Sequence, residues 1–269
     1  MKKKLVAAYL CTPYVPKSSF NNFLKNYLHY KAGIKHKLLI CYKNFHIDQL
    51  DYFRNKLKKI KHIEFIDPED KNDFDLGSYI RISKKFKDTP IFFMNSHSYP
   101  VKNNWLKIVN NHYKKKTIIA TSSSYSSFSS NSFFRNSNYN YFQYFYYIIK
   151  NILFFPLFPN PHFCTTGFLI NSNDYLKYNN YKKYNNKFKT HLAESGRWSM
   201  YKFFKKKNFF IYNVNSDNKK FLEKDWAQSD TFCFKRQSKA LISYNQSRNY
   251  LKLNKKNKRK KQITAWGVK

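Results

Sequence analysis

Short apolar runs alternate with amphipathic stretches along the first 125 residues. Helical spacing is clearest in 47–59, where Leu50, Phe53 and Leu57 recur at intervals of three and four. Ser18 or Ser19 would cap a helix that continues to about Tyr30. Further helices are predicted at 78–86 and 103–112, and strands at 5–11, 36–42, 62–67, 90–95 and 117–123. This alternation predicts βαβ units, and hence a single α/β, Rossmann-like domain with a mostly parallel central sheet and helices on both faces.

The regular alternation ends after residue 125. Residues 122–138 are Ser-rich and predict a loop, and an aromatic stretch follows at 139–161. A strand is predicted at 163–171, a helix from about residue 173, a helix at 191–207 and a strand at 208–214. The last 35 residues are polar and rich in Lys. No internal repeat is evident.

Basic residues far outnumber acidic ones. The 269 residues include 51 Lys and Arg against 15 Asp and Glu, a formal net charge of +36. Only seven of the basic residues are Arg, whereas nucleic-acid readers favour Arg for its bidentate contacts. Lys is abundant together with Asn, Tyr, Phe and Ile, whose codons are all rich in A and T. Compositional drift is therefore favoured over a selected polyanion-binding surface, although the charge attracts anions in either case.

The four cysteines and the apolar segments indicate the compartment. Cys11, Cys41, Cys164 and Cys233 are widely spaced, which predicts free thiols in a reducing, cytoplasmic setting. The apolar part of 1–11 is too short for a secretory signal and predicts a first strand. Charge and prolines interrupt 139–161, so we expect it to lie at a membrane interface rather than to span a bilayer.

Five of the 15 acidic residues fall within nine positions directly after the third predicted strand: Asp67, Glu69, Asp70, Asp73 and Asp75. Parallel sheets bind ligands beyond the carboxyl ends of their strands, so this loop belongs to the predicted ligand-binding rim. Such carboxylates can hold a cation or hydrogen-bond a ribose or a base. The alternative is a helix start at which carboxylates interact with the helix dipole.

Two further segments carry candidate chemistry. The fourth strand delivers Asn95 and His97 to the same rim, although a lone His is as often structural as functional. The segment 191–214 predicts a helix with Glu194 at its head, where the dipole would favour the carboxylate as an anion suited to general-base catalysis. Arg197 and Trp198 are predicted on the same first turn, where Arg would clamp a phosphate and Trp would stack on a sugar.

Several segments together resemble glycosyltransferases of the GT-A fold, in particular the rhamnan-synthesis F group and related family-2-like bacterial polysaccharide enzymes. DFDLGSY (73–79) and FFMNSHSYP (92–100) are similar to motifs after that group's third and fourth strands. NPHFCTTGFLI (160–170) is similar to the strand bordering its acceptor site, and AESGRWSMYKFFKKKNFFI (193–211) to its glutamate-headed helix. ISYNQSRNY (242–250) followed by TAWG resembles a C-terminal signature of the group.

The resemblance implies sugar transfer from a nucleotide-sugar donor to a glycan or lipid-linked acceptor in surface polysaccharide synthesis, with inversion. It implies a nucleotide-sugar-binding half at 1–125 and an acceptor-side half at 126–269 in one continuous domain. The implied base is Glu194, and the implied acceptor or diphosphate contacts are His162, Arg197 and Trp198. The residues implied for donor binding are Thr12, Asp73, Asp75, Tyr79, Asn95 and His97.

One departure from the family pattern concerns the metal. The Asp-x-Asp signature belongs at the end of the fourth strand, where this chain has Asn95-Ser96-His97. Asp73 and Asp75 form that pattern one strand earlier. Metal dependence on Mg²⁺ or Mn²⁺ is therefore open, with Asp75 or His97 as the candidate ligand.

Other functions stay open from the sequence. The alternative from another class is a basic nucleic-acid-binding protein without catalytic activity, which would bind with a steep salt dependence. No recognisable nucleic-acid-binding motif supports it, so no specific nucleic acid is expected as a partner. A degenerate transferase that only binds sugar is a further alternative. The favoured expectation is a cytoplasmic enzyme, peripheral at the inner face of the cell membrane.

Overall fold

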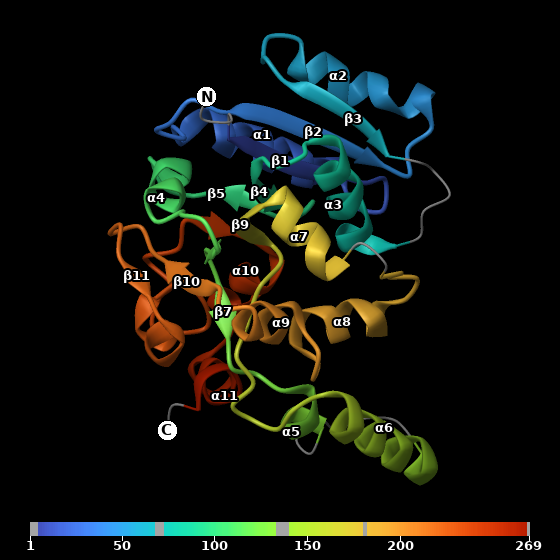
Figure 1. Ribbon diagram of the computed structural model, residues 1–269, viewed down its shortest axis with the longest axis vertical. Coiled ribbons are helices and arrows are strands. Elements are labelled where there is room, and N and C mark those ends of the chain that lie inside the picture. Colours follow the sequence, from blue (N-terminus) through green and yellow to red (C-terminus); the bar gives the residue numbers. More distant parts are fainter. Residues whose placement is uncertain (1–4, 68–72, 133–139, 180–181, 268–269) are drawn as a thin grey trace.

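A computed structural model describes residues 5–67, 73–132, 140–179 and 182–267. Its described part is organised around an eight-stranded sheet (Figure 1). From one edge to the other the strands are β11 (Lys220–Phe221), β10 (Phe210–Val214), β6 (Thr117–Ala120), β9 (Gly167–Asn171), β4 (Pro90–Met94), β1 (Val6–Cys11), β2 (Lys37–Lys43) and β3 (Ile63–Asp67).

Most strand pairs in this sheet are parallel, as the alternation of apolar and amphipathic stretches predicts. β1 pairs in parallel with β2 and β4, and β2 with β3. β9 is antiparallel to both β4 and β6, while β10 is parallel to β6. The chain order reverses at β1, whose neighbours are β2 and β4, and ligands of open α/β sheets bind beyond the carboxyl ends of strands at such a point.

Both faces of the sheet are covered, because successive residues of its central strands point to opposite sides. In β1, Val6, Ala8 and Leu10 belong to one apolar cluster, while Ala7 and Tyr9 belong to the other. The first cluster includes side chains of α3 (Phe74–Lys85), α7 (Ser172–Asn179) and α9 (Met200–Lys206). The second includes side chains of α1 (Lys17–His29), α2 (Asp51–Leu57) and α4 (Trp105–Asn111). The predicted α/β class with helices on both faces is confirmed.

Several predicted boundaries are wrong for local reasons. α1 begins at Lys17 directly after Pro16, so Ser18 and Ser19 lie in its first turn and do not cap it. A 3₁₀ turn (Ile47–Leu50) precedes α2. The predicted strand 163–171 is two strands, β8 (His162–Phe163) and β9, separated by a turn.

The Ser-rich segment is more ordered than a loop. It contains β7 (Ser123–Ser124), which pairs with β8, and a short helix α5 (Phe128–Ser132). Ser127 and Ser129 are buried and bond main-chain carbonyls of the 151–156 segment. The hydroxyl groups thus satisfy buried backbone acceptors, which explains why a polar run lies inside the molecule. Residues 133–138 of the predicted loop lie outside the described residues.

Three further helices are α6 (Tyr141–Phe154), α10 (Asn245–Lys252) and α11 (Lys255–Trp266). α5, α6 and α11 lie together at the lower end of the molecule in Figure 1. The basic C-terminal segment is helical there, and Trp266 is buried with its indole N–H bonded to the Phe232 carbonyl. Among the described residues, no helix combines the length and the apolar composition needed to cross a bilayer.

Candidate active site

A cavity of about 300 Å³ opens beyond the carboxyl ends of the central strands. Segments far apart in the sequence form it: the end of β4, the β6–α5 region, the turn before β9, α8 (Lys187–Ser195) and the start of α10. It brings together four of the residues predicted for function, Asn95, His97, His162 and Glu194. Its other lining residues are Ser126, Phe128, Cys164, Thr166, His191, Ser195, Tyr244, Asn245 and Gln246.

Asn95 is oriented by its own turn. Its side-chain oxygen accepts hydrogen bonds from the His97 backbone N–H (3.1 Å) and the Ser98 hydroxyl (2.7 Å). Its amide group is then directed to the carboxylate of Asp75, with which it also forms a hydrogen bond. Asn95 therefore links the end of β4 to the first turn of α3, where Asp75 lies.

Glu194 occupies a different position on its helix from the one predicted. The expected helix 191–207 is two helices, α8 and α9, and Glu194 is the second-last residue of α8. The break falls at Gly196, whose backbone is extended, and Ser199 begins the next helix. The helix dipole at this end disfavours a carboxylate, so the proposed dipole stabilisation is wrong. Thr165 instead donates a hydrogen bond to one Glu194 oxygen, and His191 Nδ1 lies 3.9 Å from the other.

Asp75 and Glu194 have opposite pKa shifts, although only Glu194 lines the cavity and Asp75 lies behind Asn95. Burial raises the pKa of Asp75 to about 6, and the nearby Glu194 carboxylate adds to the rise. Burial also raises the pKa of Glu194, but the interactions with His191 and Thr165 outweigh it and hold the pKa below its ordinary value. The Coulomb interaction between Asp75 and Glu194 means that they lie near each other. Pairs of carboxyls with separated pKa values are characteristic of acid–base sites.

The rest of the described acidic cluster is committed to ion pairs. Asp67 is fully buried; Arg81 Nη2 lies 2.7 Å from it, and the Ser78 hydroxyl donates to it at 2.6 Å. Asp73 is paired with both Arg81 and the buried Lys43. These bonds, together with the two cations, hold the pKa of Asp73 below its ordinary value even though burial opposes the shift. The network joins β2, β3 and α3, so it fixes the helix that carries Asp75.

The described residues do not fit a two-carboxylate metal site. The charge of Asp73 is already offset by Lys43 and Arg81, which leaves Asp75 as the available member of the Asp-x-Asp pattern. Within the ranges that the structure describes, no three His, Cys, Asp or Glu side chains are grouped to hold a metal ion. Glu69 and Asp70 lie outside those ranges. We therefore derive no step through a metal.

Thr12 and Tyr79 border the site without lining the cavity. Thr12 follows β1, and its buried hydroxyl finds no hydrogen-bond partner in the described part of the chain. Tyr79 is fully buried, its ring 4.4 Å from that of Phe93, and its hydroxyl donates to the Thr165 carbonyl at 3.4 Å. Tyr79 therefore supports the turn that holds Glu194 and does not face open space.

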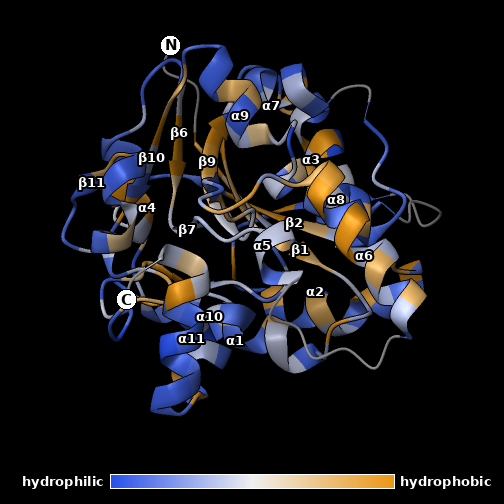
Figure 2. Ribbon diagram, turned by 90° about the horizontal axis from the view of Figure 1, so that it is seen from below, coloured by the Kyte–Doolittle hydropathy of each residue, from blue (hydrophilic) through white to orange (hydrophobic). Residues whose placement is uncertain are grey.

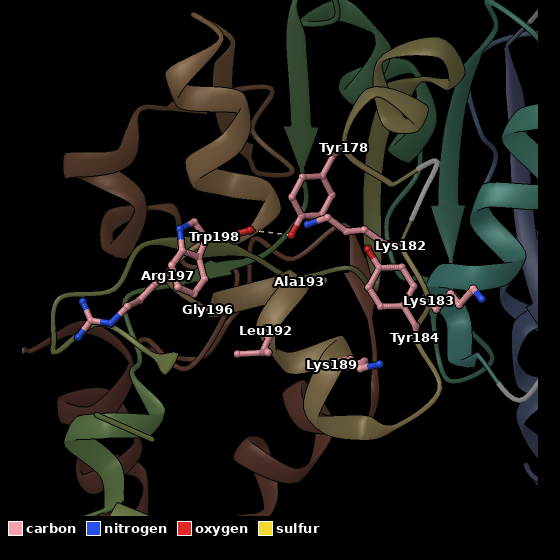
Figure 3. Close-up of a pocket in the computed structure, with 10 residues that line it drawn as sticks. All are labelled: Tyr178, Lys182, Lys183, Tyr184, Lys189, Leu192, Ala193, Gly196, Arg197 and Trp198. Carbon is pink, nitrogen blue, oxygen red and sulfur yellow. Dashed lines mark hydrogen bonds between the residues drawn. The ribbon is translucent and has the colours of Figure 1, made fainter. Parts of the chain in front are cut away.

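Arg197 and Trp198 lie on the other side of α8. His191, Glu194 and Ser195 face the first cavity, while the opposite face of α8 lines a second cavity of about 430 Å³ that includes Arg197 and Trp198. Figure 3 shows the Arg197 side chain directed away from the tyrosines of this second cavity. Its guanidinium donates to the carbonyls of Ile152 and Leu153, both at 2.9 Å. The predicted placement of both residues on the turn of Glu194 is wrong, because the chain leaves the helix at Gly196.

Several residues in or next to the cavity were not predicted from the sequence. Thr165 and His191 hold Glu194, and the Tyr244 hydroxyl lies 2.7 Å from the Ser122 hydroxyl at the cavity wall. Arg248 donates to the His97 carbonyl at 3.1 Å. The His191/Glu194 spacing of three on one helix was the one readable signal. The other contacts join residues far apart in the sequence, so their meeting depends on the fold.

Neither a protein-family model nor a curated protein sequence matches this chain. A protein from Desulfovibrio desulfuricans G20 assigned as a nucleotide-diphospho-sugar transferase is similar in structure, with 18% identity and a TM-score of 0.33 over 44% of this chain and 58% of that one. The chain thus spans less than two thirds of that protein. The inositol-1-phosphate CTP transferase of T. maritima aligns with 11% identity and a TM-score of 0.45 over 98% and 97% of the two chains.

The mannosyltransferase Ktr4p of S. cerevisiae aligns with 11% identity and a TM-score of 0.37 over 74% of this chain and 63% of that one. Likenesses of this size identify no reaction. The resemblance to rhamnan-synthesis enzymes therefore stays a prediction, and the chemistry of this chain has to be argued from its own cavity.

Proposed function

We propose that this protein is a glycosyltransferase that moves a sugar from a nucleotide-sugar donor to an acceptor hydroxyl. The observation that carries the proposal is the pair Asp75 and Glu194, two interacting carboxyls with opposite pKa shifts. Glu194 lines the cavity, and Asp75 is hydrogen-bonded to Asn95, which also lines it. The cavity lies beyond the carboxyl end of β4, a neighbour of β1 in the sheet, and its volume is at the lower end of the range for ligand pockets.

The donor side of the proposed site lies on β1, α3 and β4. The Thr12 hydroxyl, which has no hydrogen-bond partner among the described residues, and the Asp75 carboxyl are suited to ribose or base contacts. Asn95 and His97 line the cavity beside them and would contact the diphosphate. Asp73 has a supporting role in this scheme, because its carboxylate is held by Lys43 and Arg81.

Glu194 is the proposed general base. Its carboxylate accepts the proton of the acceptor hydroxyl, the freed oxygen bonds to the anomeric carbon, and the bond from that carbon to the diphosphate breaks. The nucleoside diphosphate leaves with the electron pair, which inverts the anomeric centre. The low pKa of Glu194 in the free protein makes it a weak base, but a bound diphosphate would raise that pKa through like-charge repulsion. Thr165 and His191 keep the carboxylate oriented meanwhile.

A panel of nucleotide sugars tests the proposal. We expect at least one donor to raise the melting temperature, with and without Mn²⁺ measured in parallel, and transfer to acceptor hydroxyls to be detected by release of nucleoside diphosphate. Glu194→Gln should keep donor binding and lower turnover by roughly 10²–10⁴-fold, the usual contribution of a general base. Glu64→Gln is a matched control, because Glu64 lies on β3 and pairs with Arg54. Absence of binding by any donor, or full turnover by Glu194→Gln, would overturn the proposal.

A further inference from the structure

Helix α6 exposes an unusually apolar face. Phe142 is 88% exposed and Phe145 64%. They lie on the same side of the helix as the exposed side chains of Tyr141, Tyr146, Ile149, Ile152 and Leu153. A soluble helix normally turns its apolar side chains inward, so a continuous outward stripe of this kind marks a contact surface.

The opposite face of α6 is firmly attached to the body. Asn151 is buried, and its amide donates to the Ser132 hydroxyl at 2.7 Å. The Phe154 and Phe188 rings contact at 5.4 Å, and the Arg197 guanidinium bonds two of the last carbonyls of the helix. The apolar stripe is therefore the outer face of a helix that is already packed, and not a core face without its partner.

Basic side chains of α11 lie at the same end of the molecule as the apolar face of α6, and neither helix is acidic. Neither α6 nor α11 contains Asp or Glu, while α11 carries exposed Lys255, Lys256, Arg259, Lys260 and Lys261. α6 and α11 share the lower end of the molecule in Figure 1, and Figure 2, which views this end, shows most of α11 as hydrophilic. The end of the molecule thus combines an aromatic helix with a strongly cationic one.

We propose that α6 and α11 together dock the protein onto a bilayer surface that carries anionic headgroups. Aromatic and aliphatic side chains of a surface helix enter the headgroup region, and Tyr is favoured there. Lys and Arg beside it are attracted to anionic lipids over about a Debye length. A second copy of the chain is a poor occupant, because pairing these ends would bring two α11 helices and two chains of +36 together.

A groove on the packed side of α6, where Tyr147 lies, borders the candidate active site. A cavity of about 400 Å³ lies between α5, α6 and α11, lined by Tyr147, Lys260 and Lys261 among others. Phe128 lines both this groove and the cavity that contains Glu194. A lipid-carried acceptor with its phosphate on the two lysines would present its headgroup to that cavity. This last step rests on the proposed glycosyl transfer; the docking itself does not.

Vesicle flotation with the full chain tests the docking. We expect binding to vesicles of phosphatidylcholine with phosphatidylglycerol, and at least tenfold weaker binding to phosphatidylcholine alone. Phe142→Ser with Phe145→Ser should weaken binding at least tenfold, since both side chains are exposed and the fold should be kept. Lys260→Gln with Lys261→Gln should weaken it roughly fivefold for each charge removed. Ile47→Ser and Lys58→Gln with Lys59→Gln, at exposed sites of another face, are the controls.

The outcomes separate docking from catalysis. Equal flotation of the α6 double variant and the parent chain, or equal binding to both vesicle types, would overturn the docking proposal. If the parent chain is a dimer that does not bind vesicles, and the α6 variant is a monomer, this face is instead the contact surface for a second copy. Donor binding in the absence of vesicles is measured on the same variants. A chain that binds donors but not vesicles refutes the docking alone, and one that floats but binds no donor refutes the proposed function alone.

Discussion

Replacing Asp75 by Asn should stabilise the protein, even though Asp75 is central to the proposed site. Asp75 is half-buried, and its carboxyl has a pKa of about 6 against an ordinary value of 3.8. Burial is the larger cause and the charge of Glu194 the smaller one. Asn has the same shape and no charge, and its side-chain oxygen can still accept a hydrogen bond from Asn95.

The expected gain in the free energy of unfolding depends on pH in a definite direction. Between about pH 4 and pH 6 the folded chain binds more protons at Asp75 than the unfolded chain, so parent stability falls as pH rises through this window. The shift corresponds to at most about 3 kcal/mol. Asp75→Asn should therefore gain up to about 3 kcal/mol at pH 8, or roughly 5–10 °C in melting temperature, and nothing at pH 3.5.

Urea unfolding of the parent and the variant at pH 3.5, 6 and 8 measures this gain. Because part of the rise comes from Glu194, the gain should be smaller when Asp75→Asn is made in a Glu194→Gln background. Asp48→Asn, at an exposed position, should change stability by less than about 0.5 kcal/mol. A variant that is less stable at pH 8, or one whose gain is independent of pH, would refute the reasoning.

Three other substitutions test separate parts of the structure. Glu194→Gln should abolish most turnover and remove the acid limb of the pH–rate profile, because that limb reflects protonation of the general base. In the parent chain the limb should lie at low pH, since the pKa of Glu194 is below its ordinary value. An unchanged profile would show that another group is the base. Arg197→Ala should lower stability by about 1 kcal/mol by freeing carbonyls of α6, seen as a lower melting temperature, with Arg197→Lys intermediate. Asp67→Asn should destabilise by about 3 kcal/mol in urea, since Arg81 loses its buried partner; a change below 1 kcal/mol would contradict this.

The sheet was predictable from the sequence because its strands are nearly continuous apolar runs. β1, β2, β4 and β6 are buried on both faces and are separated by amphipathic helices, so the apolar pattern alone indicates where each strand lies along the chain. The antiparallel insertion of β9 between β4 and β6 was not predictable. It depends on the turn at residues 164–166, which bears no periodic signal, and on pairing between distant segments.

Helix boundaries near the site were harder to predict for a physical reason. Residues 191–207 keep a helical pattern of apolar positions across Gly196, yet α8 ends at Ser195 and Gly196 is extended. Directly after this break, Arg197 bonds carbonyls of α6, more than 40 positions away in the sequence. Contacts of this kind carry no local sequence signal, so the position of Glu194 near the end of α8, where Thr165 and His191 hold its charge, was not predictable.

The three described aspartates of the acidic cluster have different environments, which composition and spacing do not predict. With 51 basic residues present, any carboxylate that finds a cation nearby gains from pairing, as Asp67 and Asp73 do with Arg81. Asp75 belongs to the same sequence cluster, yet its main partners are Asn95 and another carboxylate, Glu194. The spacing of the three aspartates along the chain does not distinguish them, and their different partners become apparent only in the folded structure. Because cations are so abundant here, a carboxyl whose pKa is raised by burial and by a second carboxylate is unexpected, and that contrast is why the proposed chemistry is assigned to Asp75 and Glu194.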